Sequence, residues 1–134
     1  MHKDFQRADE WSCHAIGAAI EVHRNKGPGL VESIYEKCLM RELEIQGILA
    51  VNQVIVPIEY KGYVFDEPLK LDVYIDTCLI LELKAVQKVL PEHKAQLLSY
   101  MKLLDAPVGL IINFHEMVLK DGIHRLILKG ADQP

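Results

Sequence analysis

The spacing of apolar residues predicts three helices. Residues 4–24 carry apolar side chains at three- and four-residue intervals, and their alanines allow close packing. The same spacing predicts a second helix over residues 30–46 and a third over residues 92–104, where Pro91 suits the first helical position. Residues 25–29, with two glycines and a proline, predict a sharp turn between the first two helices.

Beyond the second helix the pattern changes to that of β-strands. Residues 51–60 are rich in β-branched and aromatic side chains, and Pro57 within this stretch indicates an edge strand or a bulge. A turn at Lys61 and Gly62, a short strand at 63–65 and a loop at 66–68 follow. Further strands are predicted over residues 69–75, 78–85, 108–114 and 123–128, of which 108–114 is apolar enough to be buried on both faces.

This order of elements predicts one α/β domain over residues 1–134, with a mixed central β-sheet flanked by helices. Residues 1–24 form its N-terminal helix, and residues 129–134 form a frayed polar tail. The length suits one compact domain rather than two.

Composition excludes several classes of protein. The 134 residues include 15 Lys and Arg against 19 Asp and Glu, which gives a formal net charge of −4. This acidity argues against nucleic-acid binding by bulk charge alone, but a local basic groove or a metal-bridged phosphate stays compatible with it. Residues 1–12 lack the apolar core of a signal peptide, and no apolar run approaches the roughly 18 residues of a membrane helix. We therefore expect a cytoplasmic protein without membrane contact.

The cysteines Cys13, Cys38 and Cys78 are widely spaced and form no CxxC pair. They predict reduced, mostly buried thiols rather than a disulfide framework or a four-cysteine metal site.

The strongest chemical signal is formed by Asp72, Glu82 and Lys84. Side chains alternate along a strand, so Glu82 and Lys84 share one face, where their burial is costly without partners. Asp72 joins them only if the loop between the two strands has an odd length or the hairpin contains a bulge. A three-residue loop at 76–78 places Asp72 opposite Glu82, whereas a two-residue loop places the carboxylates on opposite faces.

Two neighbouring carboxylates offer the hard oxygen ligands that Mg²⁺ or Mn²⁺ prefers. A lysine beside them can orient or deprotonate a water molecule and offset the charge of a phosphate, so the pattern suits metal-assisted hydrolysis of a phosphodiester. The alternative is a cross-strand ion pair of Lys84 with Asp72 or Glu82.

Four other positions have a structural and a functional interpretation. Glu32 either complements the N-terminal dipole of its helix or adds a third acid to the site. Gln96 and Tyr100 share a helix face. Either this face is partly exposed and Tyr100 lies at the boundary of the core, or both side chains bind a phosphate, a metal-bound water or Lys84. His23 either interacts with the C-terminal end of the first helix or binds a metal.

Taken in order, these motifs resemble the PD-(D/E)XK nuclease superfamily. Gly29, Glu32 and Tyr35 match a GxxExxY motif, and the Asp, ExK and QxxxY motifs follow along residues 72–100. The pattern is most similar to the small GxxExxY proteins, whose sites look like those of RecB-type nucleases. The resemblance covers residues 20–128 and implies a restriction-endonuclease-like core.

The resemblance implies a set of metal ligands and a divalent cofactor, Mg²⁺ or Mn²⁺. Asp72 and Glu82 match the metal-binding acids, Glu32 matches the helix acid of the RecB-like branch, and the Leu83 backbone carbonyl is a further ligand. Leu71 stands where the superfamily motif has its proline.

The remaining roles implied are catalytic or supporting. Lys84 matches the catalytic lysine, and Gln96 and Tyr100 match the supporting pair of the RecB-like branch. His23 corresponds to a histidine that binds manganese in some RecB-like sites.

The resulting hypothesis is a metal-dependent nuclease that hydrolyses phosphodiester bonds, with DNA favoured over RNA. The alternative is an inactive nuclease-fold module that acts in binding or regulation. A third interpretation is a protein–protein adaptor with the first helix as its interface. A homodimer or a partner protein is compatible with each of these.

Overall fold

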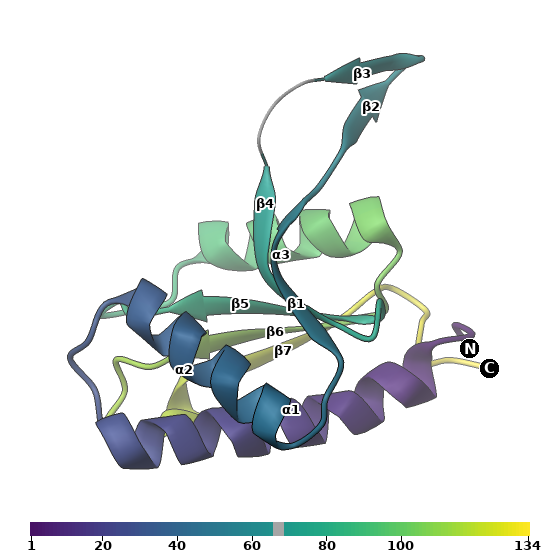
Figure 1. Cartoon of the computed structure of the whole chain (residues 1–134). Coiled ribbons are helices and arrows are strands. Elements are labelled where there is room, and N and C mark those ends of the chain that lie inside the picture. Colours follow the sequence, from purple (N-terminus) through teal and green to yellow (C-terminus); the bar gives the residue numbers. More distant parts are fainter. Residues whose placement is uncertain (66–68) are drawn as a thin grey trace.

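The computed structural model describes residues 1–65 and 69–134, and Figure 1 shows its arrangement. The predicted helices and strands are present, with boundaries that differ from the expected ones by a few residues. In chain order they are α1 (Phe5–Lys26), α2 (Glu32–Ile45), β1 (Ala50–Ile55), β2 (Ile58–Tyr60), β3 (Tyr63–Phe65), β4 (Lys70–Ile75), β5 (Leu79–Lys84), α3 (Pro91–Leu104), β6 (Val108–Asn113), the 3₁₀ helix η1 (Leu119–Gly122) and β7 (Ile123–Ile127).

A five-stranded sheet in the order β1-β4-β5-β6-β7 forms the centre of the domain. β5 and β6 run parallel because α3 connects them as a crossover, and the other neighbours run antiparallel. The helices cover both faces (Figure 1), α1 and α2 on one and α3 on the other. This confirms the expected single α/β domain with a mixed sheet.

Small side chains set the distance between helices and sheet. On one face the fully buried Ala15, Ala18 and Ala19 bring α1 close to the strands. On the other face Gly109 of β6 lies under α3, and a Cβ atom there would come within 2.8 Å of the Met101 sulfur. β6 is buried at all six positions, as its apolar sequence predicts.

A two-stranded arm rises from the sheet, formed by β2 and β3 (Figure 1). Lys61 and Gly62 turn the chain with left-handed backbone angles, φ 51° and 83°. Pro57 divides the strand-like stretch 51–60 into β1 and β2, and β1 is an edge strand of the large sheet, as Pro57 indicated. The loop expected at 66–68 lies outside the described residues.

The arm leaves the sheet at a bend in β1. Gln53 has φ 51° although it lies within a strand. Before the bend, Ala50 and Val73 pack with α1 and α2, and after it Val54 and Leu71 pack with α3. The β1–β4 ribbon therefore turns over at Gln53, opposite the position of Asp72.

The thiols differ from the expectation. All three cysteines are free, but Cys13 is exposed and Cys38 half-buried, so only Cys78 is buried. Cys13 lies on the solvent side of α1, although Ser12 and Ala15 beside it are buried.

Across the described residues, no helix combines the length and the apolar character that a bilayer crossing demands.

Candidate active site on strands β4 and β5

The hairpin of β4 and β5 has the register that brings the two carboxylates together. Val73 pairs with Leu81 and Ile75 with Leu79, so the connecting loop has three residues, as the functional interpretation requires. Continued by one position, this register places Asp72 opposite Glu82.

The carboxylates of Asp72 and Glu82 accept hydrogen bonds from backbone N–H groups of the two strands. The backbone N–H of Leu83 donates to Oδ2 of Asp72 at 2.8 Å, and the backbone N–H of Asp72 donates to Oε1 of Glu82 at 3.1 Å. Each side chain therefore reaches across to the backbone of the opposite strand. These reciprocal bonds fix both carboxylates where β4 begins to leave the sheet.

Burial makes this pair of acids electrostatically costly. Glu82 is 5% exposed. Desolvation, followed by the charge of Asp72, raises the pKa of Glu82 to about 8. Desolvation also raises the pKa of Asp72, against the hydrogen bond from Leu83 that lowers it. Two carboxylates at one buried position favour a proton or a cation between them.

Lys84 lies on the same strand face as Glu82 and is half-buried. Its positive charge lowers the pKa of both Asp72 and Glu82, though less than burial raises them. Within residues 1–65 and 69–134, none of the ion pairs closer than 4.0 Å involves Lys84. The cross-strand ion pair of Lys84 with Asp72 or Glu82, considered as the alternative, is therefore not formed.

The α3 helix adds a polar pair above the acids. Nε2 of Gln96 donates to the hydroxyl of Tyr100 at 3.1 Å, which confirms that the two side chains share a helix face. Tyr100 is 5% exposed. Burial and then the charge of Glu82 raise the pKa of its hydroxyl, so Tyr100 lies within electrostatic reach of the carboxylates and stays a neutral hydrogen-bonding group.

The α2 helix contributes two acids on one face, one of which the sequence analysis missed. Glu32 is the first residue of α2, and its charge raises the pKa of both Asp72 and Glu82. Glu36, one turn later, raises the pKa of Asp72 more strongly than Glu32 does. The four-residue spacing from Glu32 was the signal that could have identified Glu36.

Glu36 is held in place by the bend in β1. Its two carboxylate oxygens accept hydrogen bonds from the side-chain amides of Asn52 and Gln53, at 3.1 and 2.8 Å. Neighbouring strand residues normally point to opposite faces, and the left-handed backbone of Gln53 lets both reach the same carboxylate.

Tyr35 of the GxxExxY motif has a structural role. Its hydroxyl donates to the carbonyl of Gly27 at 2.5 Å and accepts from the N–H of Leu30 at 3.2 Å, while its ring stacks on Phe114 at 4.4 Å. The tyrosine thereby fixes the turn from which Glu32 begins. Gly29 within that turn has φ 108°, a conformation that only glycine adopts readily.

His23 bonds to another segment of the chain, a contact that neither interpretation of this residue described. Nε2 of His23 donates to the backbone carbonyl of Glu116 at 2.7 Å, and the side chain is 9% exposed. One ring nitrogen is thus committed to the loop after β6. Its role as a metal ligand stays a prediction, as does that of the Leu83 carbonyl.

In the described part of the chain, no three His, Cys, Asp or Glu side chains lie close enough to hold one metal ion together. Asp72 and Glu82 form a two-carboxylate site, and Glu32 acts on it from a longer distance. Such a donor set suits Mg²⁺, which commonly binds one or two carboxylates and completes its shell with water and phosphate oxygens.

Asn113 is a second position that the sequence analysis missed. It lies beside Lys84 in the β5–β6 register and is 1% exposed. Its amide donates to the carbonyl of Val86 at 2.8 Å and accepts from the N–H of Val86 at 3.1 Å. The chain that follows Lys84 is therefore fixed to β6 by a side chain. A polar residue at the end of an otherwise apolar strand was the available signal.

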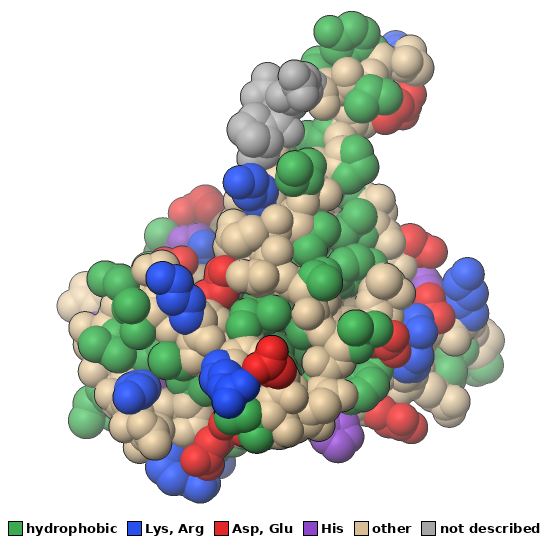
Figure 2. All heavy atoms as spheres, viewed as in Figure 1, with side chains coloured by type: hydrophobic (Ala, Val, Ile, Leu, Met, Phe, Trp, Pro, Cys, Tyr) green, Lys and Arg blue, Asp and Glu red, His purple; other side chains and the backbone are tan. Residues whose placement is uncertain are grey.

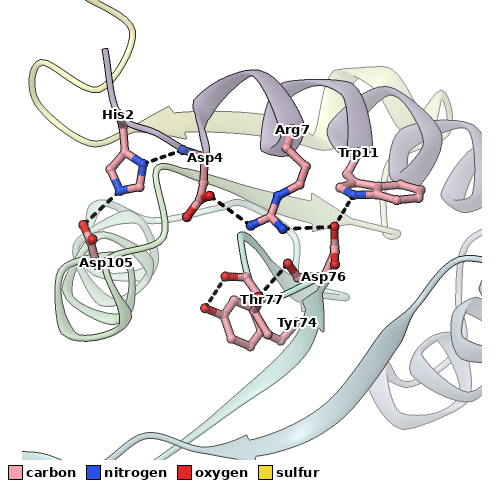
Figure 3. A network of polar contacts seen from close by, with 8 residues as sticks. All are labelled: His2, Asp4, Arg7, Trp11, Tyr74, Asp76, Thr77 and Asp105. Atoms are coloured by element: carbon pink, nitrogen blue, oxygen red, sulfur yellow. Dashed lines mark hydrogen bonds and ion pairs between the residues drawn. The ribbon is translucent and has the colours of Figure 1, made fainter.

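The opposite end of the β4–β5 hairpin is held by α1 (Figure 3). Nε1 of Trp11 donates to the Asp76 carboxylate at 2.9 Å, and Arg7 lies 3.5 Å from the same oxygen. The hydroxyl of Tyr74 donates to the carbonyl of Thr77 at 2.9 Å. Asp76 and Thr77 both have left-handed φ angles, 48° and 51°. This network stabilises the loop length on which the pairing of Asp72 with Glu82 depends.

Comparison with known proteins adds one match. A family model described as the PD-(D/E)XK nuclease superfamily matches residues 9–126. No curated protein and no solved structure matches the chain significantly. The matched range contains the five elements that build the site, α2, β4, β5, α3 and β6.

Proposed function

The chain belongs to the PD-(D/E)XK nuclease superfamily, and from this premise we propose that it is a divalent-metal-dependent nuclease that hydrolyses phosphodiester bonds of DNA. The observation that carries the proposal is the reciprocal bonding of Asp72 and Glu82 across β4 and β5. The fold holds two buried carboxylates in one place although their mutual repulsion destabilises it, which is expected where a cation is bound.

Asp72 and Glu82 are the residues that would hold Mg²⁺ or Mn²⁺, with the Leu83 carbonyl as a third donor. The bound ion would supply Lewis-acid polarisation of the scissile phosphate. Glu32 and Glu36 face the pair from α2 and can hold water molecules of the ion's shell. Members of this superfamily generally use divalent metals, which supports the assignment.

Lys84 is the residue we propose to act on the water. Its side chain shares a strand face with Glu82 and forms no close ion pair within the described residues, so its ammonium can orient a water molecule toward phosphorus and offset the charge of the phosphate. In the hydrolysis, the water oxygen bonds to phosphorus and releases a proton to solvent, the bond to one ester oxygen breaks, and that oxygen leaves as a hydroxyl after taking up a proton from solvent.

Gln96 and Tyr100 are proposed to position the substrate. The Tyr100 hydroxyl accepts the bond from Gln96 and keeps its own proton for a phosphate oxygen or for a water at the carboxylates. Together with Gly29, Glu32 and Tyr35, this pair supports placement in the GxxExxY branch with a RecB-like site.

Cleavage assays test the proposal directly. Purified protein with Mg²⁺ or Mn²⁺ should cut DNA, and EDTA should stop the reaction. Asp72→Asn should abolish cleavage, and Lys84→Ala should reduce it by at least about 100-fold, in the range typical of a lost acid–base or charge-stabilising group. Glu44→Gln and Lys129→Ala are matched surface controls that should cleave like the parent protein.

Two outcomes would reject the proposal. Equal cleavage by the parent protein and Asp72→Asn would indicate a contaminating nuclease. Absence of cleavage together with absence of metal binding would favour the inactive binding or regulatory module, a function with which the net charge of −4 is compatible.

A further inference from the structure

A cavity of about 420 Å³ lies beyond the carboxyl ends of β5 and β6. This volume falls within the range of about 300–1,000 Å³ that is usual for sites of small organic groups. Ligands of α/β proteins commonly bind where parallel strands end, and β5 and β6 are the parallel pair of this sheet. Figure 1 shows these strand ends on the same side of the molecule as the turn between α1 and α2. Three segments line the cavity, namely that turn and the segments after β5 and β6, with Pro28, Gly29, Gln87, His115, Glu116 and Met117.

A buried polar side chain fixes each of the three walls. Nε2 of His23 donates to the carbonyl of Glu116 in the segment after β6, at 2.7 Å. The hydroxyl of Tyr35 bonds to a carbonyl and an N–H of the turn between α1 and α2. The amide of Asn113 bonds to both backbone groups of Val86, just before the wall that follows β5. Because these three side chains are 9%, 0% and 1% exposed, the walls are held from inside the fold, as a preorganised ligand site requires.

The cavity and the candidate active site share two segments of the chain. Lys84 ends β5, and Gln87 of the cavity follows it by three residues. Gly29 of the cavity precedes Glu32, the first residue of α2, by three residues as well. Three residues span at most about 11 Å, so a DNA strand with one phosphate at Lys84 can place a neighbouring nucleotide in the cavity.

The lining side chains suit a nucleobase better than a phosphate. None of the lining residues that the structure describes is lysine or arginine, and Glu116 is acidic, which disfavours an anion. Gln87 and His115 carry hydrogen-bonding groups for the edge of a base, and Pro28 and Met117 offer apolar surface to its face. A base inside a duplex is paired and stacked, so only an unpaired base can enter without paying the cost of extrusion.

We propose that this cavity binds an unpaired nucleobase next to the scissile phosphate, so that the substrate is a single strand or the unpaired end of a duplex. The inference rests on the proposed function for its substrate, DNA, and adds the part of that substrate which the protein recognises.

The arm is the alternative place for bases. Tyr60 and Tyr63 are 62% and 65% exposed, and Figure 2 shows hydrophobic side chains along the arm. Bases stack on such rings without needing hydrogen bonds. The cavity is favoured because its walls are fixed by buried bonds and because it offers hydrogen-bonding groups together with apolar surface. Tyr63→Ala separates the two surfaces.

Competition binding in Ca²⁺, measured by fluorescence anisotropy, tests the inference with the full chain. A labelled single strand is displaced by two unlabelled strands of equal length, one of normal DNA and one with an abasic sugar at every position. The parent protein should bind the normal strand at least about tenfold more tightly, because only that strand has bases to bond. The double variant Gln87→Ala/His115→Ala should bind both strands equally.

The matched control is His14→Ala/Gln133→Ala, which removes the same two side-chain types from exposed positions outside the cavity. It should keep the tenfold preference of the parent protein. Circular dichroism should show the same thermal transition in both double variants, so that a lost preference reports the cavity rather than the fold.

Cleavage in Mg²⁺ separates this inference from the proposed function. The parent protein should cut a single strand at least about tenfold faster than a blunt duplex, and Gln87→Ala/His115→Ala should lose that preference. A parent protein that cleaves DNA but binds normal and abasic strands equally would overturn the inference and leave the nuclease. A preference for the normal strand without any cleavage would support the cavity and reject the nuclease.

Two further results would overturn the inference. One is a parent protein that binds neither strand in Ca²⁺. The other is a preference that is lost in Tyr63→Ala and kept in Gln87→Ala/His115→Ala, which would assign the binding of bases to the arm.

Discussion

Glu82 is an acidic side chain that is buried next to a second carboxylate, and burial opposes its negative charge. Its strand neighbours are fully apolar, it is 5% exposed, and yet it faces a second carboxylate. The fold accepts this cost by supplying a backbone N–H to each acid. The pKa of Glu82 is raised because the carboxylate is buried and lies near the charge of Asp72.

Without metal, the stability of the protein should fall as pH rises from 5 to 8. The folded protein keeps a proton on Glu82 up to a pKa of about 8, whereas the unfolded chain releases it near 4.5. The folded state thus binds more protons in this window, and the free energy of unfolding decreases there by an amount on the order of a few kcal/mol. Urea denaturation in EDTA measures this slope.

Glu82→Gln should flatten that dependence, because the amide does not titrate. Glu44→Gln, an exposed position on α2, should follow the parent protein across the same range. An undiminished slope in Glu82→Gln would show that Glu82 is not the group responsible.

At the scale of elements, two left-handed backbone segments determine where the site forms. One is the loop at Asp76 and Thr77, which sets the register of β4 and β5, and the other is Gln53, where the ribbon turns over opposite Asp72. Apolar periodicity identifies the strands but does not report a left-handed residue inside one of them. For this reason the sequence predicted the hairpin but left its loop length open between two and three residues, and it did not predict that β2 and β3 leave the sheet as an arm or where Glu36 lies.

Thr77→Asn should stabilise the protein by about 0.5–1 kcal/mol. Threonine is β-branched and unfavourable at φ 51°, whereas asparagine tolerates the left-handed region. The Tyr74 bond is to the backbone carbonyl of residue 77 and is kept. Urea denaturation at constant pH measures the change, and a destabilised variant would show that the Thr77 hydroxyl, which donates to the Asp76 carbonyl, outweighs the strain.

Tyr35→Phe should destabilise the protein by about 1–3 kcal/mol, because the carbonyl of Gly27 and the N–H of Leu30 lose their hydroxyl partner. The exposed Tyr60→Phe is the control and should change the free energy of unfolding by less than about 0.5 kcal/mol. If the two variants have the same stability, Tyr35 does not hold the turn before α2.

For the molecule as a whole, the structure has the pairings that strand alternation and helical spacing predicted. Asp72 and Glu82 lie opposite one another on β4 and β5, and Gln96 bonds to Tyr100 on α3. That these residues and Lys84 form one active site stays a prediction. Glu32 acts on the carboxylates at longer range, and His23 bonds to the loop after β6. The periodicity of a helix or strand determines the face on which a residue lies. The distance between a helical residue such as Glu32 and the strands depends on tertiary packing, which the periodicity does not report.

The net charge of −4 also has a consequence at this scale. A chain with a net charge of −4 should bind DNA weakly in EDTA and more strongly with a divalent ion, since the ion offsets the charge of Asp72 and Glu82. Fluorescence anisotropy with a labelled oligonucleotide, using Ca²⁺ to avoid cleavage, measures this difference. Equal affinity in EDTA and Ca²⁺ would contradict it.

The central claim is that Asp72 and Glu82 together bind a divalent ion, and calorimetric titration with Mn²⁺ at pH 8 tests it most directly. The account predicts binding by the parent protein and by Glu44→Gln, and loss of at least about tenfold in affinity in both Asp72→Asn and Glu82→Gln. Mn²⁺ binding that is absent from the parent protein, or unchanged in both variants, would contradict it.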